Sequence, residues 1–187
     1  KTNGGVKAPQ QTAMKITSTV LQNGVTYGNV DFNCDIEPTD DNNCSIRSLA
    51  SAFKVSYKKA YYAAQAIWNR EDNLGIYGYQ ANQLAQMTLW GKKSERMGEV
   101  ITKQSEHGEW EVELFSDKTL GKWYPIGGGS KKFRRMSVGT FFKTYNEGSY
   151  ILVVNGHMFA FVDGEVRGNY SDAIMLKRPI ESAYKVN

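Results

Sequence analysis

The sequence predicts an α+β fold in a single domain, and three observations indicate it. Apolar residues recur at helical spacing between Cys44 and Trp68, whereas continuous apolar runs typical of strands lie between Tyr150 and Tyr170. The helices come first and the strands later, instead of alternating as they do around a parallel sheet. A chain of 187 residues is long enough to bury its own hydrophobic core, so we expect one domain spanning 1–187.

The N-terminal part of the chain is expected to form a hairpin behind a loose arm. Residues 1–11 are polar and contain glycine, which favours an arm without regular structure. β-Branched residues alternate on both sides of Asn23-Gly24 within 12–30, as is typical of a two-stranded hairpin. The acidic stretch 31–43 contains Pro38 and several Asp and Asn residues, so it predicts a loop.

Helices are expected directly after this loop. The first begins at Cys44, behind Asn42-Asn43 as candidate caps. Its apolar face is formed by Ile46, Leu49, Ala50 and Phe53. Ser56 is placed to cap a second helix over 57–68, and the apolar pattern favours a third helix over 79–90.

The rest of the chain has the pattern of short antiparallel strands with one further helix. Asn155-Gly156 and Asp163-Gly164 are turn signals between the last three strands. Ser137 is placed to cap a helix over 138–145. We expect strands over 100–102, 110–115, 150–154, 157–162 and 165–170.

Charge and composition limit the partners of the protein. The net charge is +4, and we interpret the basic cluster at 131–135 as a solvated loop, so a nucleic-acid partner is not expected. No stretch approaches the roughly 18 apolar residues of a membrane span, so no membrane contact is expected. With two histidines and two cysteines, we expect no metal site, no cofactor and no disulfide framework, and a reducing compartment is favoured.

Cys44 and His157 are the candidate catalytic pair. A thiol at a helix N-terminus lies near free backbone N–H groups, which favour the thiolate and stabilise an oxyanion. His157 begins a distant strand and supplies an imidazole, the usual general base near neutral pH. This arrangement is the one found in papain-like enzymes. A disulfide between Cys34 and Cys44 is the structural alternative, and His107, in a charged loop, is expected to be exposed.

Two segments resemble known peptidases. The segment 41–47, Asp-Asn-Asn-Cys-Ser-Ile-Arg, resembles the nucleophile segment of ovarian-tumour-type (OTU) deubiquitinases, which runs Asp-Gly-Asn-Cys, two residues and Arg. It is also similar to the Cys-x-x-Arg helix of papain-like peptidases encoded by bacteriophages, and the segment 148–164 resembles their histidine hairpin. The resemblance implies a papain-like fold, in which a helical part carrying the cysteine packs on an antiparallel sheet carrying the histidine.

The resemblance also implies roles for residues around the cysteine. Asp41 matches the family aspartate three residues before the cysteine and is expected to shape the oxyanion hole. Asn42 stands where the family has glycine. Arg47 matches the family arginine, and we expect it to bind Asp40 or Asp41. Acidic side chains this close are expected to raise the pKa of the thiol, so that activation depends on the histidine.

The residue that orients the imidazole is chosen from strand register and from the resemblance. In the family an acid or asparagine usually lies on the strand after the histidine strand, and Asn169 opposes His157 if the intervening turn is a three-residue loop. With a two-residue turn, Gly168 shares the face of His157 and Asp172 lies diagonal to it. We therefore expect Asn169 in this role, with Asp172 and Asp163 as alternatives.

Together these observations predict a cysteine peptidase or isopeptidase that hydrolyses a protein or peptide substrate through Cys44, His157 and Asn169. The alternative is a catalytically inactive papain-like module that binds a protein partner or nucleic acid. A deamidase or transferase would use the same acyl-enzyme chemistry. The resemblance implies a phage protein located in the host cytoplasm or associated with the virion.

Overall fold

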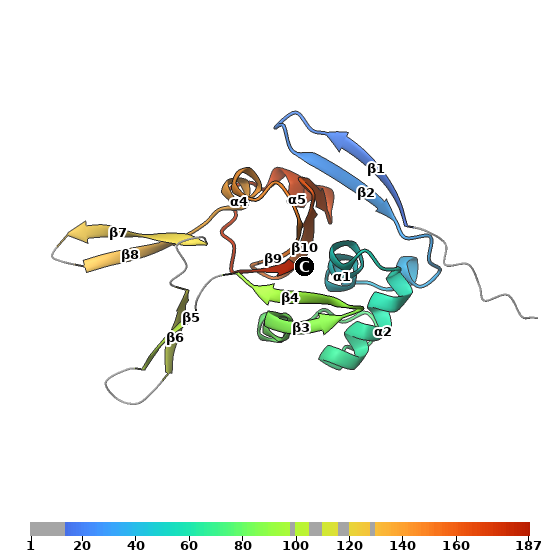
Figure 1. The fold of residues 1–187 in the computed structure, drawn as a ribbon, viewed down its shortest axis with the longest axis horizontal. Helices are drawn as coiled ribbons and strands as arrows, with labels where there is room; N and C mark the ends of the chain where they lie inside the picture. Colours follow the sequence, from blue (N-terminus) through green and yellow to red (C-terminus); the bar gives the residue numbers. More distant parts are fainter. Residues whose placement is uncertain (1–13, 98–99, 105–109, 116–119, 128–129) are drawn as a thin grey trace, which may run out of the picture.

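An eight-stranded sheet forms the centre of the protein (Figure 1), and the predicted mixed α+β class is confirmed. The computed structural model describes residues 14–97, 100–104, 110–115, 120–127 and 130–187. In sheet order the strands are β1 (Lys15–Val20), β2 (Thr26–Asp31), β11 (Glu165–Arg167), β10 (His157–Val162), β9 (Ser149–Val154), β12 (Ser182–Val186), β4 (Lys92–Arg96) and β3 (Gln86–Leu89). Neighbouring strands run antiparallel, except β2 and β11, which are parallel.

Helices lie on both faces at the centre of this sheet (Figure 1). They are α1 (Cys44–Phe53), α2 (Tyr57–Trp68), α4 (Val138–Thr144) and α5 (Tyr170–Ile174). Side chains of β9 and β10 alternate between two cores: Val153 and Met158 pack with α1 and α2, whereas Leu152 and Phe159 pack with α4 and α5. Burial on both faces explains why these two strands are continuous apolar runs.

Serine side chains cap two of the helices, as predicted. Ser56 Oγ accepts a hydrogen bond from Lys59 N–H at the start of α2, and Ser137 Oγ accepts one from Thr140 N–H at the start of α4. The predicted start of α1 at Cys44 and the predicted bounds of α2 are both confirmed. The hairpin expected around Asn23-Gly24 is also confirmed as β1 and β2.

The helix expected over 79–90 is wrong. A single turn of helix, α3 (Gly78–Ala81), is followed by a 3-10 turn at Asn82–Ala85. The chain then extends and pairs with β4 as the edge strand β3. Pairing with the sheet therefore outweighs the helical spacing of the apolar residues in this segment.

The strand expected over 165–170 is shorter than predicted. It ends at Arg167, and the chain turns into α5 at Tyr170. Asn169 is the N-cap of this helix, and Asp172 occupies the third helical position. This spacing is that of a capping box, a helix-start signal that outweighs continuation of the strand.

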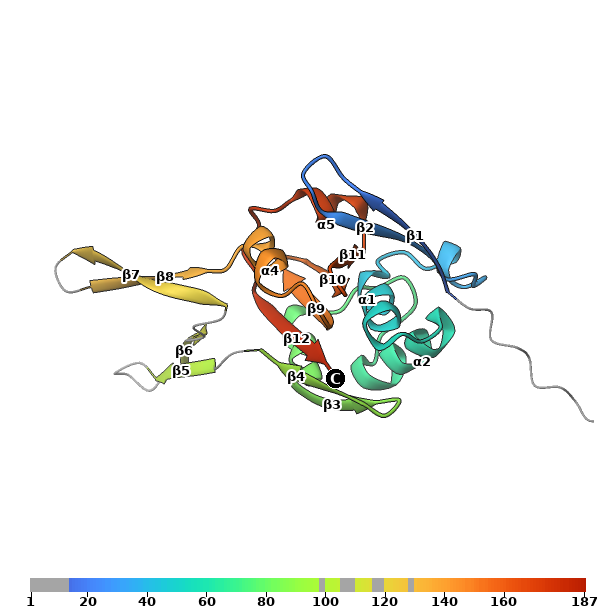
Figure 2. The same ribbon diagram turned by 45° about the horizontal axis from the view of Figure 1, so that its top comes forward.

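Two separate ribbons project from the body on the side away from α1 and α2 (Figures 1 and 2). One pairs β5 (Val100–Gln104) with β6 (Trp110–Phe115), which confirms the strands expected there. The other pairs β7 (Gly121–Gly127) with β8 (Ser130–Arg135). The basic cluster at 131–135 therefore belongs to a strand, and the expectation of a loop is wrong.

Two expectations fall outside the described residues, namely the arm at 1–11 and the exposure of His107. The longest of the described helices, α2, has 12 residues. Within the ranges given above, no helix is long and apolar enough to cross a bilayer.

Candidate active site

The thiol of Cys44 lies at the N-terminus of α1. The N-cap, Asn43, makes no side-chain capping bond, so the cap leaves the N–H groups of the first turn to other acceptors. The thiol accepts hydrogen bonds from the backbone N–H groups of Ser45 and Met158. The carbonyl of Cys44 accepts a bond of 2.6 Å from Ser48 Oγ, which fixes the first turn. These donors and the positive end of the helix dipole favour the thiolate.

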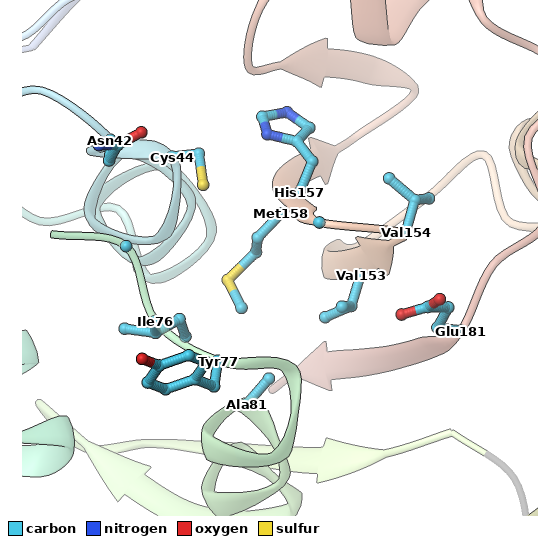
Figure 3. A pocket seen from close by; sticks show the side chains of 12 residues that line it. Asn42, Cys44, Ile76, Tyr77, Ala81, Val153, Val154, His157, Met158 and Glu181 are labelled. Atoms are coloured by element: carbon cyan, nitrogen blue, oxygen red, sulfur yellow. The ribbon is translucent and has the colours of Figure 1, made fainter.

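His157 is the first residue of β10, the strand on which α1 packs. A two-residue turn at Asn155-Gly156 leads into it from β9, with Val154 and His157 directly opposite each other. Gly156 has a φ of 68°, in the left-handed region that glycine enters without steric cost. As a result the side chains of His157 and Cys44 border one cavity (Figure 3).

The carboxylate of Asp172 holds the imidazole of His157 at Nε2. Its Oδ2 atom lies 2.9 Å from His157 Nε2 and also accepts a hydrogen bond of 2.7 Å from Asn169 N–H. The Asp172 side chain is 1% exposed and the imidazole 17% exposed, so this contact is largely shielded from water. The other ring nitrogen, Nδ1, is left for the thiol of Cys44.

This contact corrects the expectation that Asn169 orients the ring. Asn169 gives its backbone N–H to Asp172, and the ring contact at Nε2 is made by the Asp172 carboxylate. Val162 does oppose Glu165, as a two-residue turn requires, but β11 ends before a residue opposite His157 is reached. The start of α5 then brings Asp172, one of the two alternatives, to the ring.

Asp163, the other alternative, does not reach the imidazole. It lies in the turn between β10 and β11, at the end of β10 opposite to His157. Its carboxylate binds Lys54 Nζ at 3.1 Å and accepts a hydrogen bond from Gly148 N–H. Burial raises the pKa of Asp163, but these contacts outweigh burial and lower it below its ordinary value. Asp163 therefore joins the C-terminus of α1 to the sheet.

Gly168 is required for the contact between Asp172 and His157, although sequence reasoning set it aside for having no side chain. A Cβ at this position would lie 2.6 Å from Asp172 Oδ2 and 2.7 Å from Phe159 Cβ. The Tyr27 hydroxyl donates a hydrogen bond of 3.2 Å to the Gly168 carbonyl. The hairpin that carries Tyr27 thus holds the loop from which Asp172 approaches the ring.

The electrostatics of the site favour a thiolate beside an imidazolium. Burial raises the pKa of Cys44, but the hydrogen bond to His157, the two backbone N–H groups and the attraction of the imidazolium together bring it below its ordinary value. Burial lowers the pKa of His157, but the contacts with Asp172 and Cys44 outweigh burial and raise it to about 9. The acidic loop, which is expected to raise the pKa of the thiol, is not among the largest influences on it, whereas His157 is.

The thiol and the imidazole border a cavity of about 120 Å³ (Figure 3). One wall is the segment 75–77 with the following turn of α3, and the other is formed by β9 and β10. Glu181 lies at the end of the cavity remote from Cys44 in Figure 3. The apolar lining consists of Ile76, Ala81, Val153, Val154 and Met158. An apolar wall beside the thiol limits the access of water to the reacting atoms.

The loop before Cys44 places Asn42 at this cavity, whereas Asp41 is exposed and is not part of its lining. Asp41, expected to shape the oxyanion hole, is therefore not part of the cavity lining, whereas its neighbour Asn42 is. Asn42 has a φ of 54°, a left-handed conformation that glycine adopts most easily and asparagine tolerates best among the other residues. Asn42 thus holds a backbone conformation of the kind that glycine favours.

A cluster of polar residues, which we call the Asp40 cluster, anchors this loop. It consists of the buried Asp40, Tyr57 and Arg70 and of the exposed Asn73. Arg70 Nη2 lies 2.6 Å from Asp40 Oδ1, and the two side chains are 0% and 3% exposed. Asp40 also accepts hydrogen bonds from the Tyr57 hydroxyl and from Asn73 N–H, and Asn73 binds Asp41 and Asn42 in turn. The cluster therefore joins the nucleophile loop to the segment that forms one wall of the cavity.

Two further expectations about the surroundings of Cys44 are corrected or closed. Arg47 binds Glu37, in the 3-10 turn Glu37–Thr39, instead of an aspartate of the loop, and its guanidinium lies 5.3 Å from the centre of the Phe32 ring. Both Cys34 and Cys44 are free thiols, so the disulfide alternative is absent. Among the described residues, no group of three or more His, Cys, Asp or Glu is placed to hold a metal ion.

The chemistry of the site is inferred from its geometry, because comparison with known proteins found no match. No protein-family model, no curated protein and no solved structure matches this chain. What the site offers is a thiol on a helix N-terminus, an imidazole on the adjoining strand and a buried carboxylate on the far ring nitrogen. This arrangement is suited to nucleophilic attack by sulfur with proton transfer through the ring.

Proposed function

We propose that this protein is a cysteine peptidase or isopeptidase of papain-like architecture. The observation that carries the proposal is the contact of the Asp172 carboxylate with Nε2 of His157, an imidazole that borders the same cavity as the thiol of Cys44. These residues come from α1, β10 and α5, which are far apart in the sequence. A histidine that is only packed in a core would not be expected to have both a buried carboxylate at Nε2 and a thiol beside the ring.

The papain-like part of the proposal is supported by the layers of the fold. The helix that carries Cys44 packs on the antiparallel strand that carries His157, and both residues border the proposed cleft, which lies between the segment 75–77 and the strands β9 and β10 (Figure 3). The short segments at 41–47 and 148–164 resemble the two catalytic segments of such peptidases in the same order. Residues with one chemistry in the expected order on the expected elements support a shared mechanism.

Acylation begins with the thiolate. Cys44 Sγ attacks the carbonyl carbon of a peptide or isopeptide bond, and the carbonyl oxygen becomes an oxyanion. The imidazolium of His157 then gives its proton to the leaving nitrogen, so that the C–N bond breaks and the amine departs. A thioester to Cys44 and a neutral imidazole remain.

Deacylation uses the same groups in reverse. Neutral His157 takes a proton from water while the water oxygen attacks the thioester carbon. Collapse of the second oxyanion breaks the C–S bond, which releases the carboxylic acid and restores the thiolate and the imidazolium. Asp172 holds the ring in place through Nε2 and stabilises its positive form.

The oxyanion is assigned to the N-terminus of α1. The backbone N–H of Cys44 belongs to the first helical turn, where N–H groups and the helix dipole stabilise negative charge. Asn42 lines the cavity next to the thiol, so we assign its side-chain amide as the second group near the oxyanion. The Asp40 cluster fixes the loop that carries this amide.

The alternative is an inactive binding module, which an unheld imidazole would favour. The contact of Asp172 with His157 argues against it, because a buried carboxylate holds the ring at Nε2. The raised pKa of His157 and the lowered pKa of Cys44 also favour a working pair over an unused one.

The proposal is tested by labelling the folded protein with an electrophilic thiol probe and by assaying hydrolysis of fluorogenic peptide amides and of an isopeptide-linked pair. We expect labelling at Cys44 and turnover by the wild type and by Cys34→Ala, because Cys34 is a free thiol outside the site. Cys44→Ala should lose both. Equal labelling of the two cysteines, or hydrolysis that persists in Cys44→Ala, would overturn the proposal.

A further inference from the structure

The positive charge of the protein is concentrated in the ribbon formed by β7 and β8. Residues 121–135 contain five of the 23 Lys and Arg residues and none of the 19 Asp and Glu residues, so they contribute +5. The other 172 residues, with 18 basic and 19 acidic side chains, have a net charge of −1. The net charge of +4 is therefore a property of this ribbon and not of the body that holds the proposed active site.

The ribbon projects away from the central sheet in both views (Figures 1 and 2). Among the strands that the structure describes, β7 and β8 pair only with each other, and the ribbon is joined to the body at its base. There Met136 N–H donates to the Leu120 carbonyl at 2.6 Å, and Arg135 lies 3.9 Å from Glu181. A two-stranded ribbon alone has marginal stability, so its sequence is not explained by a contribution to the core.

The strand register distributes the cations over both faces of the ribbon. Lys122 lies opposite Arg134, and Tyr124 lies opposite Lys132, so these four positions share one face. The other face has the opposed pairs Gly121 and Arg135, Trp123 and Phe133, and Pro125 and Lys131.

We propose that the β7–β8 ribbon binds nucleic acid through the phosphate backbone. A two-stranded ribbon fits the major groove of a duplex, where phosphates flank it on both sides, and cations on both faces match this geometry. A membrane surface would meet only one face. The aromatic residues Trp123, Tyr124 and Phe133 are interleaved with the cations, in the pattern that stacks on unpaired bases. The earlier expectation of no nucleic-acid partner rested on placing the cluster in a loop.

The test measures the affinity of the full chain for a fluorescent DNA duplex and for the matching single strand, by fluorescence anisotropy over a range of salt concentrations. If all five cations contact phosphates, the slope of log K against log salt for the duplex is about −4.5. Affinity then falls roughly 500-fold between about 50 and about 200 mM salt. Binding of either probe with a steep slope supports the proposal.

A matched pair of variants assigns the binding to the ribbon. K122Q/K132Q/R134Q and K58Q/K59Q/K143Q each remove three positive charges, and the second set lies at exposed positions of α2 and α4. For the ribbon variant we expect the slope of log K against log salt to become less steep by about 2.7, whereas the control variant keeps the slope and affinity of the wild type. K122R/K132R/R134K, which keeps every charge, should bind as the wild type does. Thermal unfolding confirms that each variant is folded.

Three results would overturn the proposal. One is the absence of binding to both probes at about 50 mM salt, where phosphate contacts are strong. Another is equal weakening in the ribbon variant and the control. The third is binding to vesicles of anionic lipid without binding to nucleic acid. Cys44→Ala keeps the ribbon intact, so nucleic-acid binding persists in it whether or not the peptidase proposal holds, and the two proposals fail independently.

Discussion

Replacing Gly168 by alanine tests the contact between Asp172 and His157 without changing either side chain. The φ of Gly168 is not in the left-handed region, so the backbone accepts alanine and any effect comes from the added methyl group. That group would lie 2.6 Å from Asp172 Oδ2 and 2.7 Å from Phe159 Cβ. Because Phe159 Cβ is attached to the backbone of β10, the carboxylate of Asp172 has to give way.

The expected size of the effect follows from the two groups involved. Overpacking by one methyl group in a packed site costs about 1–3 kcal/mol of the free energy of unfolding. The difference between a pKa of 6.5 and about 9 at His157 corresponds to about 3 kcal/mol in favour of the imidazolium, shared between Asp172 and Cys44. When Asp172 moves away, its share is lost and the pKa of His157 falls. The alkaline limb of peptide hydrolysis should therefore move to lower pH.

The assay is kcat/KM against pH, with urea unfolding measured in parallel. Gly28→Ala is the matched control, because a Cβ there would lie 2.6 Å from Glu165 Oε2, again a carboxylate oxygen. Glu165 binds Arg167 at 2.9 Å and has no part in the proposed site. We expect both variants to be less stable and only Gly168→Ala to shift the alkaline limb. An alkaline limb that stays in place, or that moves equally in both variants, would refute the reasoning.

Three further predictions follow from the same contacts. Asp172→Asn keeps the shape of the side chain but removes its charge, so the alkaline limb of kcat/KM should move to lower pH. Asp172→Ala also removes the ring contact and should lose more kcat/KM than Asp172→Asn. An equal loss in both variants would contradict the orienting role of Asp172. Arg70→Met leaves Asp40 buried without its cation and should lower the free energy of unfolding by about 3–5 kcal/mol in urea titration, with partial recovery when Asp40→Asn is added. In Cys44→Ala, Asp172 still raises the pKa of His157 and so stabilises the folded state. This stabilisation is complete below pH 6.5 and is lost as the pH rises through the pKa of His157 in the folded protein. The free energy of unfolding should therefore decline over this pH window in Cys44→Ala and not in Cys44→Ala/Asp172→Asn.

The nucleophile half of the site is predictable from the sequence because its signals are local. Apolar spacing, a serine cap and the position of Cys44 behind an asparagine-rich loop define α1 and α2. The apolar runs of β9 and β10 are equally local, and they place His157 at the start of its strand. The positions of Cys44 and His157 are therefore predictable without knowledge of any tertiary contact.

The third group of the site was misassigned because it depends on where a strand ends. The expectation of Asn169 assumes a three-residue turn before β11 and follows the family pattern, but the turn has two residues, β11 stops early and the helix α5 places Asp172 at the ring. The spacing of Asn169 and Asp172, an N-cap residue and an acid three positions later, was the available signal. The need for a glycine at position 168 was not available, because it arises from contacts with Phe159 and Asp172 that only the tertiary fold creates.

The Asp40 cluster was also beyond sequence reasoning. Arg70 lies at the end of α2 and Asp40 in the loop before α1, and nothing in their spacing indicates that they are buried together. The expectation that Arg47 binds the aspartates was local and wrong, since Arg47 turns to Glu37 and leaves Asp40 to Arg70. Long-range ion pairs of this kind follow from how the elements pack and not from neighbouring residues.

The most direct test of the thiolate–imidazolium pair is the rate at which Cys44 is alkylated as a function of pH, measured in the Cys34→Ala background so that one thiol reports. We expect rapid alkylation well below the pH at which an ordinary thiol ionises, because the pKa of Cys44 is lowered by His157 and the backbone donors. Asp172→Asn should weaken this reactivity at acidic pH. A single titration at the pKa of a free thiol, about 8.5, with no change in Asp172→Asn, would contradict the account.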